Sequence, residues 1–335
     1  SLDPELVFGC HHSIHSGMKL FALVLLILVV AVPNLVAQEK PAGKGHRVLL
    51  QGNGKLAIIE NGKVEWEMKW GGIHDIHALP NGNFMTARNM REVVEIDPGT
   101  KKIVWSYDCA TMNGNKGKRI EVHAFQPLEN GNVFIAESGA GRFIEINREG
   151  KILKEFKMKL DKPHPHKDTR LARRLKNGHV LASHEGDGMV REYDVGGKVV
   201  WEYPVPLFDK KPKGGHGPTS WGNSTFACVR LENGNTLIAT GNGHSVIEVT
   251  PGKKVVWQVT QNELPMIRLA WVTTLDVLPN GNYVIGNCHA GPGNPLLVEI
   301  EPKTKKVVWQ LDEFEKFGNS VPNSVLLDLV GKTNR

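Results

Sequence analysis

A short pattern of apolar and polar positions recurs along the chain from about residue 45 onward. In each full copy, a Leu lies two residues before an Asn-Gly pair, and a short apolar run, a strand-like segment with Glu and an apolar run ending on an aromatic residue follow. The Asn-Gly pairs begin at Asn81, Asn130, Asn177, Asn233 and Asn280. Self-similarity at this spacing indicates a fold built from repeated supersecondary units.

Each copy predicts four short antiparallel strands. The Asn-Gly pair supplies the positive φ that a tight hairpin needs, and segments such as 97–101 (DPGTK) predict a second turn. Four-stranded units of about 40–50 residues are typical of β-propeller blades. Five full copies and one partial copy at 48–66 therefore predict an all-β, six-bladed β-propeller over residues 45–335, with four strands per blade.

The partial copy predicts how the ring closes. It lacks its innermost strand, and residues 319–330 contain a strand-like run that no copy uses. We expect this C-terminal strand to complete the first blade, so that no sheet edge is left open. The repeated Leu, Glu and aromatic residues occur in every copy, which predicts packing and hydrogen-bonding positions, with the Leu in the core.

A different apolar run lies outside the repeat. Met18 and Lys19 precede thirteen apolar residues, and the small residue Ala37 follows. This pattern predicts a secretory signal peptide at 18–37, after an over-called start at 1–17 and before a linker at 38–44. An uncleaved anchor is the alternative, although the run is short for a membrane span. We expect a periplasmic or secreted monomer that is not held at a membrane after signal cleavage.

Composition and charge narrow the function. The net charge of +6 comes from 41 basic and 35 acidic residues spread along the chain, so we expect no nucleic-acid surface, whereas a cationic pocket for an anion is compatible. The four Cys form no C-x-x-C pair, which excludes the usual zinc and redox motifs. The three Cys after the leader are expected to be buried core residues.

The histidines point to one face of the ring. The Asn-Gly hairpins lie on one face of a propeller, so the loops between the second and third strands and the crossovers between blades lie on the other. Nine of the 14 His map to that second face or to the inner strands that start there. His74, His123 and Arg170 precede the Asn-Gly pair by seven residues in successive blades, and are expected to surround the mouth of the central channel.

This distribution predicts an axial pocket lined by His and Arg for a small anionic or phenolic ligand. Imidazole serves as base, nucleophile or donor near neutral pH, and Arg matches sulfate, phosphate or carboxylate. The candidate catalytic residues are His74, His123, His216 and His289; the candidate binding residues are His77, His184, His244, Arg142, Arg170 and Arg268. His164 and His166 are the closest pair for a metal, but no third ligand is near in sequence, so no metal site is predicted. Each His can instead be structural.

Two segments carry a resemblance. HDIHALPNGN (74–83) and VVEIDPGTKKIVW (93–105) resemble the arylsulfotransferase-like and PQQ-like group of β-propellers, over about 290 residues. Bacterial arylsulfotransferases are periplasmic propellers that pass a sulfuryl group between phenols through a sulfated histidine, and the resemblance makes His74 the best-matched channel histidine. Quinoproteins of the group use adjacent cysteines, which are absent here, so we expect no PQQ and no other cofactor.

Two functions remain open. The first is sulfuryl transfer from an aryl sulfate through a histidine nucleophile. The alternative is a non-catalytic PQQ-like propeller that binds a small anion, a glycan or a protein partner. An enzyme needs at least two His and one Arg within contact of one buried point, whereas a scaffold ties these side chains into contacts between blades.

Overall fold

A computed structural model describes residues 45–335 of the chain. The expected start, signal peptide and linker at 1–17, 18–37 and 38–44 lie outside the described residues and stay predictions. Within the described part, no helix is both long enough and apolar enough to cross a membrane.

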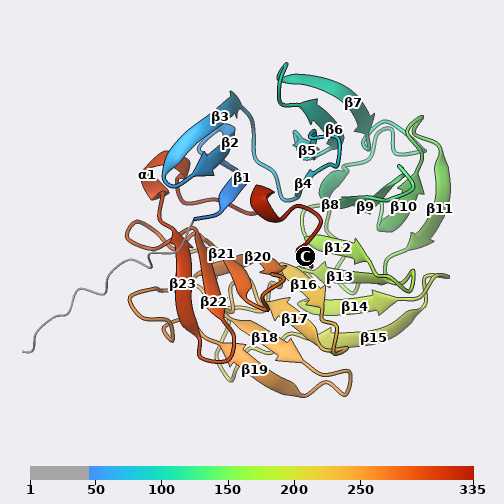
Figure 1. The fold of residues 1–335 in the computed structure, drawn as a ribbon. Coiled ribbons are helices and arrows are strands. Elements are labelled where there is room, and N and C mark those ends of the chain that lie inside the picture. Colours follow the sequence, from blue (N-terminus) through green and yellow to red (C-terminus); the bar gives the residue numbers. More distant parts are fainter. Residues whose placement is uncertain (1–44) are drawn as a thin grey trace, which may run out of the picture. The chain divides into compact units, whose positions relative to one another are not determined.

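Six four-stranded antiparallel sheets surround a central axis (Figure 1). Blade 1 is formed by β24 (Ser324–Leu326), β1 (Arg47–Gly52), β2 (Lys55–Glu60) and β3 (Lys63–Lys69). The other blades follow in chain order, each from the innermost strand outward: β4 (Ile76–Ala78), β5 (Phe84–Arg88), β6 (Glu92–Asp97) and β7 (Lys102–Asp108) in blade 2; β8 (Glu121–Pro127), β9 (Val133–Ser138), β10 (Arg142–Ile146) and β11 (Ile152–Lys157) in blade 3; β12 (Leu171–Arg174), β13 (Val180–His184), β14 (Met189–Tyr193) and β15 (Val199–Pro204) in blade 4; β16 (Ala227–Arg230), β17 (Thr236–Ala239), β18 (Val246–Val249) and β19 (Val255–Val259) in blade 5; and β20 (Trp271–Val277), β21 (Tyr283–Cys288), β22 (Leu297–Glu301) and β23 (Lys306–Leu311) in blade 6.

These sheets confirm the six-bladed propeller with four strands per blade. The only helices in the described part are α1 (Phe314–Phe317) and the short 3-10 turn η1 (Leu327–Leu329). The three described cysteines, Cys109, Cys228 and Cys288, are buried and free, as expected for core positions.

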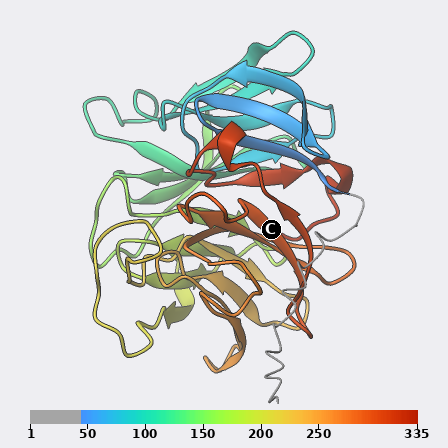
Figure 2. The same cartoon turned by 90° about the vertical axis from the view of Figure 1, so that its left-hand side faces the viewer.

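The C-terminal strand closes the ring as predicted. β24 pairs antiparallel with β1, with Val48 opposite Leu326 and Leu50 opposite Ser324. Val325 and Leu326 are 6% and 2% exposed. Both views place the red C-terminal segment beside the blue first strands (Figures 1 and 2). The first blade is therefore built from the two ends of the described chain, which covers the edge that β1 would otherwise present.

The repeated Glu joins each blade to its Asn-Gly turn. Glu95 accepts hydrogen bonds from the side chains of Asn81 and Asn83, at 3.1 and 2.6 Å, and pairs with Arg148 of the next blade. The same arrangement recurs at Glu145 with Asn132 and Arg174, and at Glu299 with Asn282 and His46. The Glu is therefore a structural position, as its recurrence predicted.

In four of the six blades, the repeated Trp joins the blade to the next one. The indole Nε1 of Trp66 donates to the carbonyl oxygen of Pro98 at 2.8 Å, and Trp105 donates to Arg148 at 2.7 Å. Trp201 and Trp257 make the same contact with Pro251 and Pro302. Each acceptor lies in the outer turn of the following blade, so these bonds fix the spacing between neighbours.

The repeated Leu is less buried than predicted. Only Leu278, at 5% exposed, belongs to the core, whereas Leu79, Leu128, Leu175 and Leu231 are half-buried and pack against it. Each starts an Asn-Gly turn, where its backbone N–H donates to the residue four positions on, as Leu128 does to Asn132. The turn holds these side chains at the rim of the blade.

Leu128→Ala is therefore expected to lower the free energy of unfolding by roughly 1–2 kcal/mol, less than the 2–5 kcal/mol typical of a fully buried Leu. Chemical denaturation monitored by fluorescence measures this loss, with the buried Leu237→Ala as the matched core variant. A loss for Leu128→Ala as large as that for Leu237→Ala would contradict the half-buried placement.

Candidate functional site

His74, His123 and Arg170 meet on the face of the ring opposite the Asn-Gly turns. His74 and Arg170 lie just before the inner strands β4 and β12, and His123 lies on β8. His74 Nδ1 is 2.6 Å from His123 Nδ1, and Arg170 Nη1 is 3.1 Å from His74 Nε2. Arg170 is also ion-paired with buried Glu185. The structure thus brings together three of the candidate residues.

The contacts fix where the protons sit. The Arg170 guanidinium has only donors, so His74 Nε2 must accept a hydrogen bond from it. His74 therefore carries its proton on Nδ1 and donates it in a hydrogen bond to His123 Nδ1. Burial lowers the pKa of His74 well below its ordinary value, with the charges of His123 and Arg170 acting in the same direction. Burial likewise lowers the pKa of His123 to about 4. Both rings are neutral at pH 7, and neither has a free nitrogen facing solvent.

Glu121 lies beside this group. Its Oε2 accepts a hydrogen bond from His166 Nδ1 at 2.6 Å and is 3.2 Å from His123 Nε2. The imidazoles of His123 and His166, together with Arg119, hold the pKa of Glu121 well below its ordinary value. From the sequence, His166 was considered only together with His164, as a pair of metal ligands that lacked a third. It is His166, and not His164, that reaches the cluster.

His216 and His289 form a second group on this face. Their ring centroids are 5.1 Å apart, and His216 lies 4.8 Å from Trp271. Trp271 packs with Phe226 and Cys288, and Phe226 also faces His74, with 5.9 Å between the ring centroids. The candidate catalytic residues therefore occupy two groups with an apolar cluster between them.

The structure places four other candidates elsewhere. His184 bonds to the carbonyl oxygen of Asp168 and to the Tyr193 hydroxyl, and His244 bonds to the carbonyl oxygens of Ala270 and Ser220. Arg142 pairs with Glu137. Arg268 is exposed, and its guanidinium lies 3.5 Å from the carbonyl oxygen of Pro218. These contacts tie together loops and strands, and none of them reaches His74 or Arg170.

A buried ion pair lies between the histidine face and the opposite end of the channel. Arg173 of blade 4 donates to both carboxylate oxygens of Asp75 in blade 2, at 2.7 and 2.9 Å. Asp75 and Arg173 are 1% and 5% exposed. Asp75 also accepts from the backbone N–H of Phe125 in blade 3. This pair links three inner strands across the axis.

On the Asn-Gly face the axis opens into a pocket of about 1030 Å³. His77 lies at its floor, where its Nε2 bonds to the carbonyl oxygen of Phe125. Of the candidate binding residues, His77 alone lines this pocket. The remaining lining includes the five repeated Leu and the cationic residues Arg173, Arg174, Lys176, Arg230, Lys332 and Arg335.

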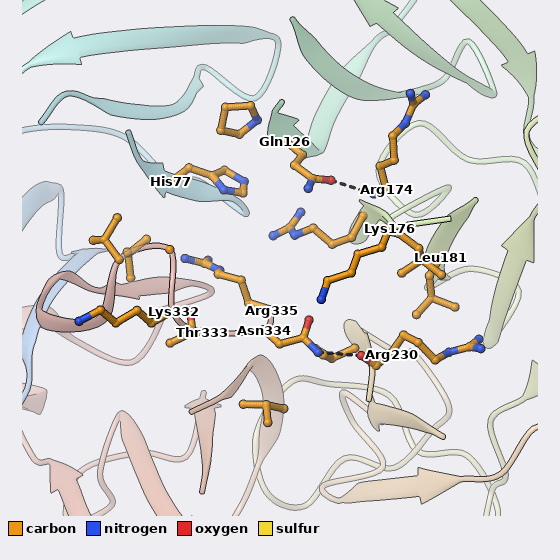
Figure 3. Close-up of a pocket in the computed structure, with 18 of the residues that line it drawn as sticks. His77, Gln126, Arg174, Lys176, Leu181, Arg230, Lys332, Thr333, Asn334 and Arg335 are labelled. Carbon is orange, nitrogen blue, oxygen red and sulfur yellow. Dashed lines mark hydrogen bonds between the residues drawn. The ribbon is translucent and has the colours of Figure 1, made fainter. Parts of the chain in front are cut away.

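The cationic side chains differ in how they face the pocket. Figure 3 shows Lys176 and Arg335 extending into the space between the blades, while the guanidinium groups of Arg174 and Arg230 point away from it. Arg174 and Arg230 are ion-paired with Glu145 and Glu192. The Lys176 side chain, in contrast, has no ion pair or hydrogen bond within the described residues.

Asp276 lies behind Arg335. The Arg335 Nε is 3.6 Å from Asp276 Oδ1, and Asp276 is 1% exposed. Burial raises the pKa of Asp276, although the charge of Arg335 acts in the opposite direction. Arg335 also donates to Asn323 Oδ1 at 3.0 Å. These contacts hold the Arg335 side chain in the channel.

This pocket lies at the end of the channel opposite the histidine face, where the sequence predicted the ligand site, and the site on the histidine face stays a prediction. Residues four positions before the Asn-Gly pairs of blades 2 to 5 line the pocket, and they include His77, Gln126 and Arg173. Residues seven positions before these pairs do not line it. The repeat register contains these positions. The residues at 330–335, however, belong to no repeat, and no signal in the sequence showed that they enter the pocket.

Comparisons with known proteins place the chain among propellers. A protein of unknown function from Bacteroides caccae matches at 23% identity and a TM-score of 0.67, covering 84% of this chain and 98% of its own. A streptogramin B lyase structure matches at 10% identity and a TM-score of 0.51, covering 81% and 83%. At these identities the likeness shows the fold alone. No curated protein sequence matches.

A family model gives the more specific result. The PQQ_2 family, described as outer membrane protein assembly factor BamB, matches residues 52–316. The arylsulfotransferase-like part of the resemblance is not supported by any of these matches, whereas the PQQ-like part is. With six blades, a repeat match over most of its length and a ring closed by its C-terminal strand, the chain belongs to the PQQ-like BamB family of β-propellers.

Proposed function

We propose that this protein is a ligand-binding propeller that holds an organic anion in the axial pocket on its Asn-Gly face. The observation that carries the proposal is the unpaired Lys176 side chain, which extends into a pocket of about 1030 Å³ (Figure 3). Small-molecule sites typically have volumes of about 300–1,000 Å³, so the pocket is large enough for a drug-sized ligand.

The charges favour an anion. Arg335 reaches into the pocket beside Lys176, and Lys332 adds a third cation to the lining. The lining has two acidic residues, Glu129 and Glu232, both exposed and both beside an Asn-Gly turn. Cationic groups inside a concave site attract an anion more strongly than they would on an open surface, because its low-dielectric walls focus the field.

The apolar part of the lining narrows the ligand class. Leu residues from blades 2 to 6 line the pocket at equivalent positions, namely Leu79, Leu128, Leu175, Leu231 and Leu278. An apolar collar around a cationic centre suits a ligand with an aromatic or aliphatic body and a carboxylate, sulfate or phosphate group. We therefore favour an amphipathic organic anion over a glycan, which carries little apolar surface.

Sulfuryl transfer is the weaker candidate. A histidine nucleophile needs a free ring nitrogen, but His123 is fully buried and both nitrogens of His74 are engaged. Of the four candidate catalytic histidines, this leaves His216 and His289 accessible. The binding function needs none of these histidines. It also agrees with the family match, which carries no sulfotransferase description.

Lys176→Met is expected to weaken binding of 4-nitrophenyl sulfate about tenfold, which corresponds to about 1.4 kcal/mol, because it removes an unpaired positive charge that extends into the pocket. Isothermal titration calorimetry measures the dissociation constant. The matched control is Lys303→Met, an exposed lysine on the same face outside the pocket. Added salt should weaken binding to the wild-type protein.

Three outcomes count against this proposal. Absence of saturable binding for 4-nitrophenyl sulfate and 4-nitrobenzoate would remove the anion site, as would equal affinity in the wild type and Lys176→Met. Release of 4-nitrophenolate from the sulfate when a phenol is added would instead support sulfuryl transfer. A binding protein leaves the sulfate ester intact.

A further inference from the structure

Three side chains on the histidine face converge on one point. Glu121 and His123 come from the start of β8, and His166 comes from the crossover between blades 3 and 4. One carboxylate oxygen and two imidazole nitrogens of these residues lie within 4.8 Å of one another. We propose that Glu121, His123 and His166 bind a divalent transition metal of the zinc type, independently of the anion pocket on the opposite face.

The distances are close to those of a metal site. Zinc binds imidazole nitrogen and carboxylate oxygen at about 2.0–2.2 Å, so tetrahedral ligand atoms lie roughly 3.4 Å apart. Glu121 Oε2 is 3.2 Å from His123 Nε2 and 2.6 Å from His166 Nδ1. The first distance already fits. The second must lengthen by less than about 1 Å, and His166 is free to move because its side chain is 36% exposed in a loop.

His123 Nε2 is the observation that points to a ligand. This nitrogen is fully buried and has no hydrogen-bond partner in the described structure, although Glu121 Oε2 lies 3.2 Å from it. A buried polar atom without a partner costs about 1–3 kcal/mol. A metal ion between His123, Glu121 and His166 supplies the missing partner.

The surrounding residues hold these ligands in position. His123 Nδ1 is 2.6 Å from His74 Nδ1. When His123 Nε2 binds a metal, His123 Nδ1 carries the proton and donates it in a hydrogen bond to His74 Nδ1. Arg119 donates to the other oxygen of Glu121, at 3.1 and 2.6 Å. Metal-binding histidines and carboxylates are commonly oriented by such outer hydrogen bonds.

Arg170 limits the affinity of this site for a metal ion. A metal on His123 Nε2 shifts the His74 proton to Nε2, the nitrogen that faces Arg170 Nη1 at 3.1 Å. Arg170 must then give up this contact, while it keeps its ion pair with Glu185. We therefore expect a dissociation constant in the micromolar range, weaker than that of a structural zinc site.

The ligand set selects the kind of metal. Two imidazoles and one carboxylate suit zinc, cobalt or nickel, whereas magnesium and calcium prefer oxygen ligands alone. Three protein ligands leave a coordination position open. The sequence spacing did not predict this site because three further strands of blade 3, β9 to β11, separate Glu121 and His123 from His166.

Chelator-treated, untagged full chain titrated with Co²⁺ is expected to show one equivalent of binding in the visible spectrum, with Zn²⁺ displacing it. His166→Ala and Glu121→Gln should each weaken binding at least tenfold. The control is the His216→Ala, His289→Ala double variant, which removes two imidazoles from the same face. Equivalents are counted as the difference from His166→Ala, because His11, His12 and His15 add imidazoles to the full chain.

Retained binding in the control and lost binding in both site variants would support the site. Equal Co²⁺ binding in the wild type, His166→Ala and Glu121→Gln would overturn it, as would loss only in the His216, His289 variant. Melting curves without metal show whether each variant is folded. His166 is half exposed, so His166→Ala is expected to melt like the wild type.

Discussion

Removal of residues 319–335 is expected to abolish the stable monomer. The deletion removes β24 and exposes the edge of β1 from Val48 to Leu50. It also removes the buried side chains of Val321, Val325 and Leu326, which contribute about 1.5–3 kcal/mol each. The total loss of about 5 kcal/mol or more is comparable to the whole stability of many domains. Thermal melting and size-exclusion chromatography measure the outcome.

The shorter deletion of residues 331–335 is the control. It keeps β24 paired with β1 but removes Arg335 from its place beside Asp276. We expect this variant to remain a folded monomer with a smaller fall in melting temperature. If the longer truncation melts like the full chain, β24 does not close the ring.

Asp75→Asn is expected to lower the free energy of unfolding by about 3–5 kcal/mol, the usual cost of leaving one partner of a buried ion pair unpaired. The change removes the charge that compensates Arg173 across the axis. Urea denaturation measures the effect. The double variant Asp75→Asn, Arg173→Met should lose less stability than the sum of the two single variants, because it leaves no buried charge behind.

The pH dependence of stability provides a second test of this pair. Burial alone would raise the pKa of Asp75, but the charge of Arg173 and the contact with His77 bring it well below its ordinary value. A depressed carboxyl pKa stabilises the fold fully above the unfolded-state pKa of about 4. That stability is lost as the pH falls from there through the folded-state pKa. Asp75→Asn should lack this component, and an identical acid dependence in both proteins would contradict the assignment.

The fold was predictable because its signals are local and repeated. Each Asn-Gly turn, Glu and terminal aromatic residue recurs at the same register, and the missing strand of the first copy could be matched to residues 324–326. The Glu and Trp contacts between blades follow from the same periodicity. The periodicity did not predict the burial of the repeated Leu correctly, because the tight turn that follows keeps Leu128 and its equivalents at the rim of the blade.

The candidate site was predictable only in part. Register brought His74, His123 and Arg170 to one point, but it could not show that their nitrogens bond to one another. Nor could it show that Arg173 crosses the axis to Asp75. Such contacts depend on the directions in which side chains of different blades point. Asp75 and Arg173, for example, are 98 residues apart in the sequence. The pocket also needs residues 331–335, whose position depends on tertiary contacts such as the pairing of Asn334 with Val277.

The most direct test of the anion-binding function is the position of 4-iodobenzoate in crystals of the protein, located by the anomalous scattering of iodine. We expect iodine in the axial pocket on the Asn-Gly face, with the carboxylate against Lys176 or Arg335 and the ring among the repeated Leu. Iodine bound only beside His74 and Arg170 on the opposite face, or only at surface lysines outside the pocket, would contradict the proposed function.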